Sequence, residues 1–374
     1  MASSDDLVAQ FNKTYGKATA TVGVALYNTP RQKTGIFEFD LGTGGGLPIG
    51  KITEIFGPES SGKTNLLLSA AGEAQRDHPG AKVAIIDQED SLSSAGKWIS
   101  NFLDPDRLLI IRPDYAEAVV DMAEKLVEAE DICFLGIDSI AAMVATAELE
   151  KSAEGHTMGG NSIVVQKLIR KLVAALARVN KQYETGQRTL IPPPVVLINQ
   201  IRHQIGVMFG SPEKTPGGFA PKFAAALRVR TYGRNIVDKK ISDTMPTIKQ
   251  TDIVIQKWKV PIISTAIKYD MVTIPHGGFE VRQTKAWNMV EAALKSMGHL
   301  HKGEKDKGWV MFGEPYPTLI ACMTRFHEDA VFRQKLLTYL IKQGLNDPEA
   351  VPPAEGELAE EVVFVDPATG APIE

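Results

Sequence analysis

From residue 51 onward the sequence alternates short apolar runs with amphipathic stretches, and this alternation constrains the fold more than any other feature. The apolar runs have the length of β-strands and lie at residues 52–56, 83–86, 108–111, 132–137 and 195–198. The stretches between them have helical spacing and include residues 65–75, 116–128 and 163–180. Apolar strands separated by helices are typical of a parallel sheet covered on both faces. We therefore expect an α/β fold with a mostly parallel sheet.

The regions on either side of this alternation differ from it. Residues 5–15 have helical spacing of apolar side chains, and residues 19–27 are rich in β-branched side chains. After residues 275–278 the rhythm changes to a small mixed region, with expected helices at 286–297 and 329–343. No Lys or Arg follows Lys342, and residues 347–361 are rich in Pro, Ala and Glu. We expect an N-terminal helix and strand (1–34), a core (35–275), a small C-terminal α+β domain (276–346) and an acidic, disordered tail (347–374).

Composition excludes several classes of protein. The chain has 374 residues, 44% of them apolar and 23% charged, which is ample for a folded core. Its two cysteines, Cys133 and Cys322, form no disulfide framework and suit a reducing cytosol. No apolar stretch is long enough to span a membrane, and the first residues lack a signal-peptide pattern, so we expect a cytoplasmic protein without membrane contact. The net charge of −4 requires any nucleic acid to bind at a local basic surface.

A glycine-rich turn between an apolar strand and a helix fits the pattern G-x-x-x-x-G-K-[ST]. Its residues are Gly57, Pro58, Glu59, Ser60, Ser61, Gly62, Lys63 and Thr64. In such a P-loop, backbone N–H groups and the helix N-terminus surround phosphates, the lysine reaches the β- and γ-phosphates, and the hydroxyl ligates Mg²⁺. The alternative is a chance glycine-rich turn, against which the flanking strand and helix argue. We predict that this loop binds a nucleotide.

Two further carboxylates complete the expected nucleotide site. The apolar strand at 132–137 ends at Asp138, as in a strand that holds Mg²⁺ together with Thr64. Because Ser139 follows it, the base that activates water must come from elsewhere. The strand at 83–86 runs into Asp87-Gln88-Glu89, and we expect it to lie beside the P-loop and to supply Glu89 as the general base on the γ-phosphate side. A solvated acidic loop is the alternative for this segment.

Residues 205–210 are too apolar for an ordinary exposed loop, while the glycines and prolines around them disfavour a stable strand. Apolar side chains such as Ile205 and Phe209, with Arg202 nearby, suit a partner that offers base faces and phosphates. A buried connection is the alternative. The basic side chains Lys167, Arg170, Lys171 and Arg178 suit the same partner, or they form a solvated helix face.

At this point the chain resembles the bacterial RecA family. The similarity rests on GTGGGLPIGKITEIFGPESSGKT (residues 42–64), on NQIRHQIGVMFGSPEKTPGG (199–218) and on Asp87-Gln88-Glu89. It is specific between about Gly42 and Pro261, weaker at the N-terminus, and limited to layout beyond Gly278. It implies a RecA-like P-loop ATPase core that uses ATP and Mg²⁺, with a helix and strand that link subunits at the N-terminus.

The resemblance also implies roles for single residues. Gln200 would sense the γ-phosphate, and Lys257 and Lys259 would reach the nucleotide of a neighbouring subunit, with Phe223 as an interface aromatic. The residues implied to contact DNA are Met158 and Gly159 in a first loop, Arg170, Arg202, Gly217 and Gly218 at the backbone, and Ile205 as a wedge between bases. Two departures are Gly96, where the family has a tyrosine that stacks on adenine, and Ile163 in place of an arginine.

The implied activity is that of a DNA-dependent ATPase, which forms a filament on single-stranded DNA and catalyses homologous pairing and strand exchange with duplex DNA. Single-strand-binding and mediator proteins are implied as further partners, in a bacterial cytosol or nucleoid or in a phage-infected cell. The divergent C-terminal region suggests a member of viral type. The alternatives are a ring-forming helicase on the same core and a mediator that binds DNA without hydrolysing ATP.

Overall fold

The structure of the chain is a computed structural model. The structure describes residues 3–15, 29–92, 99, 102–149, 160–203, 213–237, 239, 247–273, 286–303, 308–345 and 347. The expected strand at 19–27 and the acidic tail from 348 onward lie outside these residues. Within the described ranges, no helix is long and apolar enough to cross a membrane.

An eight-stranded sheet forms the centre of the described chain, with the order β12-β11-β10-β3-β7-β6-β4-β5. Its strands are β3 (Ile52–Gly57), β4 (Lys82–Asp87), β5 (Leu108–Ile111), β6 (Ile132–Asp138), β7 (Val195–Gln200), β10 (Leu227–Ile236), β11 (Ile248–Trp258) and β12 (Ala266–Val272). Neighbours from β10 to β5 pair in parallel, and β11 is antiparallel to both β10 and β12. The mostly parallel α/β fold is therefore confirmed.

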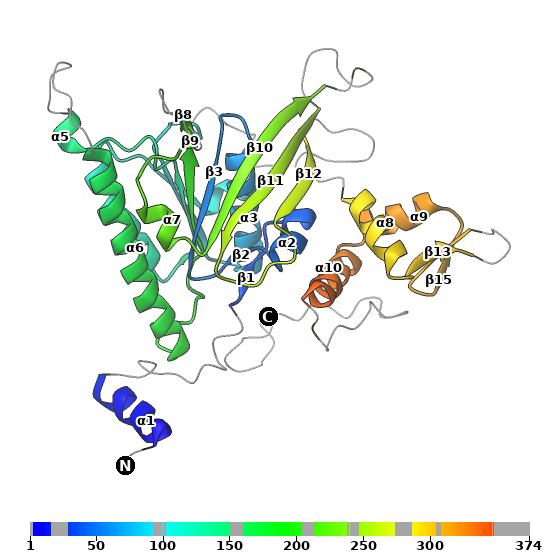
Figure 1. The fold of residues 1–374 in the computed structure, drawn as a ribbon, viewed down its shortest axis with the longest axis horizontal. Helices are drawn as coiled ribbons and strands as arrows, with labels where there is room; N and C mark the ends of the chain where they lie inside the picture. The colour runs from blue at the N-terminus through cyan, green and yellow to red at the C-terminus, as the bar shows by residue number, and fades with distance from the viewer. Residues whose placement is uncertain are drawn as a thin grey trace.

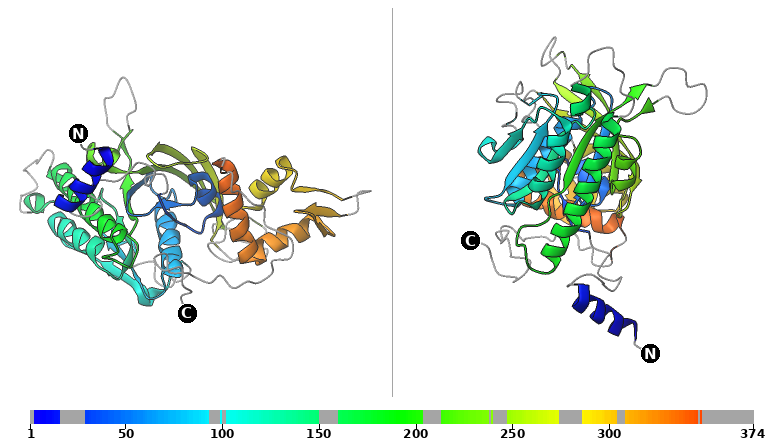
Figure 2. Two further views of the ribbon diagram at one scale, coloured as in Figure 1. Left: turned by 90° about the horizontal axis from the view of Figure 1, so that it is seen from below. Right: turned by 90° about the vertical axis from the view of Figure 1, so that its left-hand side faces the viewer.

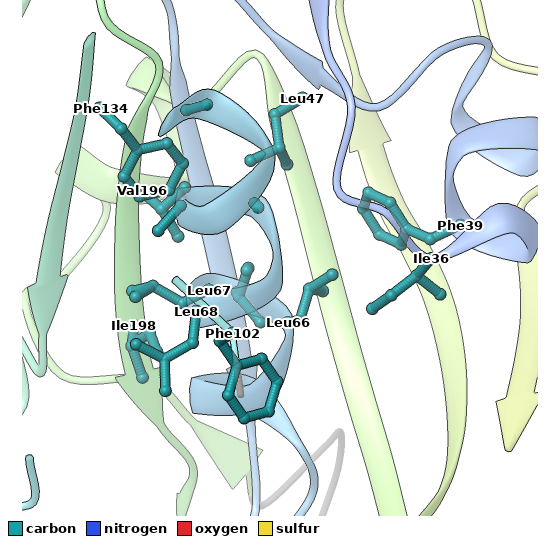
Figure 3. Packing of buried hydrophobic residues seen from close by; sticks show 14 of the residues in the cluster. Ile36, Phe39, Leu47, Leu66, Leu67, Leu68, Phe102, Phe134, Val196 and Ile198 are labelled. Atoms are coloured by element: carbon teal, nitrogen blue, oxygen red, sulfur yellow. The ribbon is translucent and has the colours of Figure 1, made fainter. Parts of the chain in front are cut away.

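Helices cover both faces of this sheet because successive side chains of each buried strand point to opposite faces. Val83 and Ile85 of β4 join the cluster around α3 (Lys63–Asp77), whereas Ala84 and Ile86 join the cluster around α4 (Ala116–Glu128) and α6 (Gly160–Glu184). Figure 3 shows the first cluster, where Leu67 and Leu68 of α3 lie against Phe134, Val196 and Ile198 of the sheet. This double cover explains why the inner strands β3, β7, β6 and β4 are so apolar, whereas the edge strand β5 is only partly buried.

Short elements complete the core. They are β1 (Arg31–Gln32), α2 (Phe37–Thr43), β2 (Leu47–Pro48), a 3-10 turn (Pro105–Arg107), α5 (Thr146–Leu149), β8 (Arg202–His203), β9 (Glu213–Lys214) and α7 (Ala220–Ala224). Helix α1 (Ser4–Tyr15), the expected N-terminal helix, lies apart from the core in Figure 1 and in the right view of Figure 2.

A small α+β domain follows the core, as predicted. It contains α8 (Trp287–Ser296), β13 (Leu300–Lys302), β14 (Trp309–Met311), β15 (Glu314–Tyr316), α9 (Leu319–Glu328) and α10 (Ala330–Gly344). The three strands form an antiparallel sheet with their own apolar cluster, which Phe37 of α2 joins from the core. Figure 1 shows this domain beyond the β12 end of the large sheet.

The strand order of the large sheet separates β4 from the P-loop strand. Strand β4, which leads to Glu89, does not neighbour the P-loop strand β3, because β7 and β6 lie between them. From β3 to the edge, the parallel strands follow the order β3, β7, β6, β4, β5, which differs from their order in the sequence.

Candidate active site

The P-loop (residues 57–64) joins β3 to α3 at the carboxyl edge of the sheet. Gly62 caps α3 with a φ of 91°, a left-handed conformation that favours glycine. The Lys63 ammonium donates to the carbonyl oxygens of Pro58 at 2.7 Å and Gly57 at 3.3 Å. Burial lowers the pKa of Lys63, and the carboxylates of Asp138, Glu89 and Glu59 oppose this shift. The loop is thus closed around a lysine that three carboxylates surround.

Strands β10 and β11 support the loop from beneath. The Ser61 hydroxyl lies 2.7 Å from the hydroxyl of Thr231 on β10. A Cβ atom at Gly233 would lie 2.6 Å from the Cα of Ser61, so only a glycine lets the strand approach so closely. The loop therefore has a fixed floor, and the sequence pattern around residue 57 could not show which strands provide it.

Thr64 and Asp138 come together at the place expected for Mg²⁺. The Thr64 hydroxyl donates to the Asp138 carboxylate at 2.8 Å. Burial, together with the nearby carboxylates of Glu89 and Asp87, raises the pKa of Asp138 to about 6, although Thr64 and Lys63 act in the opposite direction. A hydroxyl and a buried carboxylate are oxygen ligands of the type that Mg²⁺ prefers. The residues therefore fit this cation.

Glu89 lies at the same cavity although its strand is not adjacent to β3. Its Oε1 atom accepts a hydrogen bond from Gln200 Nε2 at 2.6 Å and a second from the Ser139 hydroxyl. The neighbouring Asp87 accepts bonds from the backbone N–H groups of Ser91 and Leu92. Of the two carboxylates in this segment, Asp87 thus fixes the local turn, and Glu89 is the one in the cavity.

The cavity itself has a volume of about 390 Å³ and combines predicted with unpredicted residues. Its lining is Glu59, Ser60, Ser61, Gly62, Lys63, Thr64, Asn65, Glu89, Asp138, Gln200, Asn235, Lys249 and Thr273. Sequence reasoning missed Asn235 and Lys249, which lie on β10 and β11. Both strands lack a continuous apolar run, and Lys249 comes beside Asn235 only through the pairing of β11 with β10, so no local sequence signal marked them.

A buried network connects the end of β7 to the segment implied to contact DNA. Asn199 Nδ2 donates to Glu54 Oε1 at 2.9 Å and to the carbonyl oxygen of Pro216 at 3.0 Å. Glu54 in turn pairs with Arg228. Because Asn199 directly precedes Gln200, this network ties the position of Gln200 to the segment before α7.

The predicted DNA-contact residues fall into two groups. Arg170 is exposed on α6, Gly217 and Gly218 lie in the turn before α7, and the backbone of Arg202 pairs with Lys214. Met158, Gly159, Ile205 and Phe209 lie outside the described residues, as does Gly96. The structure therefore locates the ends of the two expected loops.

The four basic side chains on α6 fall into an ion-paired group and an exposed group. Lys171 pairs with Asp121 and Glu124 of α4, and Arg178 pairs with Glu124 and Glu128 of the same helix. For Lys171 and Arg178, these ion pairs favour the solvated helix face. Lys167 and Arg170 are exposed on the same helix.

Lys257 and Lys259 lie at the opposite edge of the sheet from the P-loop of their own chain. Lys257 pairs with Arg228, near the start of β3, whereas Lys249 pairs with Asn235 beside the P-loop. Both ammonium groups donate to the carbonyl oxygen of Phe223 at 2.8 Å, so they point the same way. The Phe223 ring is 71% exposed.

Comparison with known proteins agrees with this geometry. The model of the RecA N-terminal domain family matches residues 4–273. The chain is 38% identical over 232 residues to Protein RecA of Leptospira meyeri. The matched region covers 60% of this chain and 55% of that protein. It is 33% identical over 286 residues to Protein RecA of Mesoplasma florum, covering 73% of this chain and 77% of that protein.

A third relative, Protein RecA of Nautilia profundicola, is 41% identical over 199 residues, or 52% of each chain. In the proteins from Leptospira and Nautilia the chain thus spans little more than half of the relative's length. The family model covers well over half of the chain and includes the whole P-loop site. The chain therefore belongs to the RecA family.

Proposed function

We propose that this protein is a DNA-dependent ATPase that forms a filament on single-stranded DNA and catalyses homologous pairing and strand exchange with duplex DNA. The observation that carries the proposal is the hydrogen bond between Gln200 and Glu89. It joins the expected general base to the residue from which the expected DNA-binding segment begins. Family membership and the contacts of Asn199 to the far end of that segment support the same conclusion.

In this proposal the cavity at the P-loop binds ATP. Lys63 and the backbone N–H groups of residues 60–64 hold the phosphates, and Thr64 and Asp138 hold Mg²⁺. The bound Mg²⁺ supplies positive charge that offsets the charge of the phosphates. Glu89 accepts a proton from the attacking water, while Ser139 and Gln200 keep its carboxylate oriented.

ATP binding is coupled to DNA binding through β7. The Gln200 amide donates to Glu89 in the structure. A γ-phosphate bound beside these two residues offers the amide a second acceptor, so the hydrogen bond can move from Glu89 to the phosphate. Residues 202–218 follow directly and contain the apolar segment and the glycines that contact DNA in this proposal. The exposed Arg170 adds a phosphate contact from α6.

Subunit contacts follow from the same assignment. We assign residues 1–34 to subunit linkage, 35–275 to the ATPase and DNA-binding core, 276–346 to the C-terminal domain and 347–374 to an acidic tail. The separation of α1 from the core supports a linking role for the first segment. Lys257 and Lys259 act on the nucleotide of a neighbouring copy, and Phe223 lies in that interface.

Electron microscopy on single-stranded DNA with a non-hydrolysable ATP analogue tests the proposal. We expect helical filaments, which a Lys63→Ala variant does not form because it lacks the lysine that binds the phosphates. Closed rings would replace the proposal by a ring helicase. DNA binding that needs no nucleotide and is unchanged in Lys63→Ala would replace it by a mediator.

A further inference from the structure

The strand pair β10–β11 presents a row of side chains to the P-loop. Asn235 and Lys249 are directly paired across these strands, and Gly233 is paired with Thr251. Because side chains alternate between the two faces of a sheet, all four positions lie on one face. On this face Gly233 approaches the backbone of Ser61, and a Cβ atom at Gly62 would lie 2.7 Å from the Thr251 hydroxyl. Lys249 therefore projects from the same face as the floor of the P-loop.

Lys249 contacts the tip of the loop. Its ammonium donates to the carbonyl oxygen of Ser60 and, at 3.0 Å, to the side-chain oxygen of Asn235. Ser60 has a φ of 55°, a left-handed conformation unusual for a residue with a side chain. The bond from Lys249 thus stabilises the loop where its backbone turns.

The charge of this lysine is available to an anion. Among the described residues its two acceptors are neutral oxygens, and an ammonium group has three N–H donors. Lys249 lines the same cavity as Lys63 and Thr64. Because Lys249 is only 7% exposed, solvent screens its charge less than that of a surface lysine. The third N–H donor of Lys249 therefore lies in the cavity proposed to bind phosphates, and a phosphate oxygen is a suitable acceptor for it.

We propose that Lys249 is a second cation of the phosphate site, which holds the tip of the P-loop through Ser60 and donates its remaining hydrogen bond to the phosphate chain of the bound nucleotide. This inference rests on the proposed function, since it assumes that the cavity binds ATP and ADP. Asn235 is a positioning residue, because it holds the lysine on the P-loop side of β11.

Binding of ADP and of inorganic tripolyphosphate to the full chain, measured by calorimetry at fixed Mg²⁺ and several NaCl concentrations, tests the assignment. Tripolyphosphate isolates the phosphate contact, since it has neither base nor ribose. The variants are Lys249→Gln and Lys249→Met, which remove the charge, and Lys249→Arg, which keeps it. The matched control is Lys268→Gln on β12, whose side chain is 56% exposed. Circular dichroism checks that each variant is folded, and the two neutral variants guard against a folding defect in one of them.

We expect both neutral variants to bind the two ligands about tenfold to hundredfold more weakly, as for the loss of one hydrogen bond to a charged group. Their binding should also depend less on NaCl, because a screened attraction is gone. Lys249→Arg and Lys268→Gln should bind within about threefold of the parent, a difference of about 0.65 kcal/mol.

Three results would overturn the inference. Neutral variants that bind tripolyphosphate as well as the parent would show that Lys249 does not contact phosphate, and the proposed function would still stand. Weaker binding with an unchanged salt dependence would reduce Lys249 to a support of the P-loop. A parent chain that binds neither ligand would refute the proposed function itself, and this inference with it.

Discussion

The ion pair between Glu54 and Arg228 is buried within the sheet, and replacing Glu54 by glutamine should destabilise the core strongly. Glu54 on β3 is fully buried, and Arg228 on β10 is 8% exposed. The pair is bonded through Arg228 Nε and Glu54 Oε2, and the guanidinium lies 3.9 Å from the centre of the Phe56 ring. Glutamine keeps the shape of the side chain and an oxygen for Asn199, but it leaves the arginine charge without a counter-ion.

The expected loss is about 3–5 kcal/mol of unfolding free energy, the usual cost when one partner of a buried pair is removed. Two contacts limit the damage, because Arg228 also donates to Gln256 at 3.0 Å and to Thr215 at 3.4 Å. No cavity is created, so the loss reports the uncompensated charge together with the bond from Arg228 Nε, which the amide nitrogen of glutamine cannot accept. The double variant Glu54→Met, Arg228→Met removes both charges and should be closer in stability to the parent than the single variant.

Urea unfolding followed by circular dichroism measures the difference. We expect a lower midpoint with an unchanged slope for Glu54→Gln, because the surface exposed on unfolding stays the same. A loss below about 1 kcal/mol would show that solvent or another group neutralises Arg228. A double variant that is less stable than the single one would refute the reasoning, since the pair itself would then stabilise the fold.

Three predictions concern activity. Glu89→Gln should bind ATP and DNA normally, because an amide oxygen can accept the bonds from Ser139 and Gln200, but hydrolysis should fall about a hundredfold or more in a phosphate-release assay. Near-normal turnover would assign the base to another carboxylate. The double variant Lys257→Ala, Lys259→Ala should bind ATP yet lose DNA-stimulated hydrolysis, and mixing it with Glu89→Gln protein should restore part of the turnover; full activity of the double variant alone would contradict action on a neighbour. Truncation after residue 346 should tighten DNA binding at low salt in an anisotropy titration, because the acidic tail competes with phosphates. An unchanged affinity and salt dependence would leave the tail without this role.

The parallel strands could be predicted because of where they lie. Strands such as β6 are buried on both faces, so every residue before the terminal Asp138 is apolar and the run stands out in the sequence. The three strands β10, β11 and β12 are partly exposed and contain several charged side chains, and only β11 and β12 alternate buried with exposed residues over part of their length. Such strands have no continuous apolar run that distinguishes them from loops in the sequence.

The same distinction divides the site residues. Lys63 and Thr64 belong to a local motif, whose spacing alone indicates phosphate chemistry. Lys249 is 189 residues away from Ser60 in the sequence, and their contact depends on the register in which β11 pairs with β10. The place of Glu89 at the cavity likewise depends on the strand order, because Glu89 follows β4, which is not adjacent to β3. Long-range register and strand order are set by packing of the whole sheet, and no local pattern carries them.

The two edges of the sheet constrain how copies of the chain can assemble. The P-loop, Asp138 and Gln200 lie at the carboxyl edge, and Lys257 and Lys259 lie at the opposite edge of the same chain. If these lysines act on ATP, they must do so on another copy, and the surface they belong to differs from the surface they meet. Such a heterologous contact repeats head to tail and yields an open helix or a closed ring, never a twofold dimer. Filaments are therefore expected to lose hydrolysis at each interface that lacks either the lysine pair or Glu89, which is why mixing the two inactive variants should restore part of the turnover.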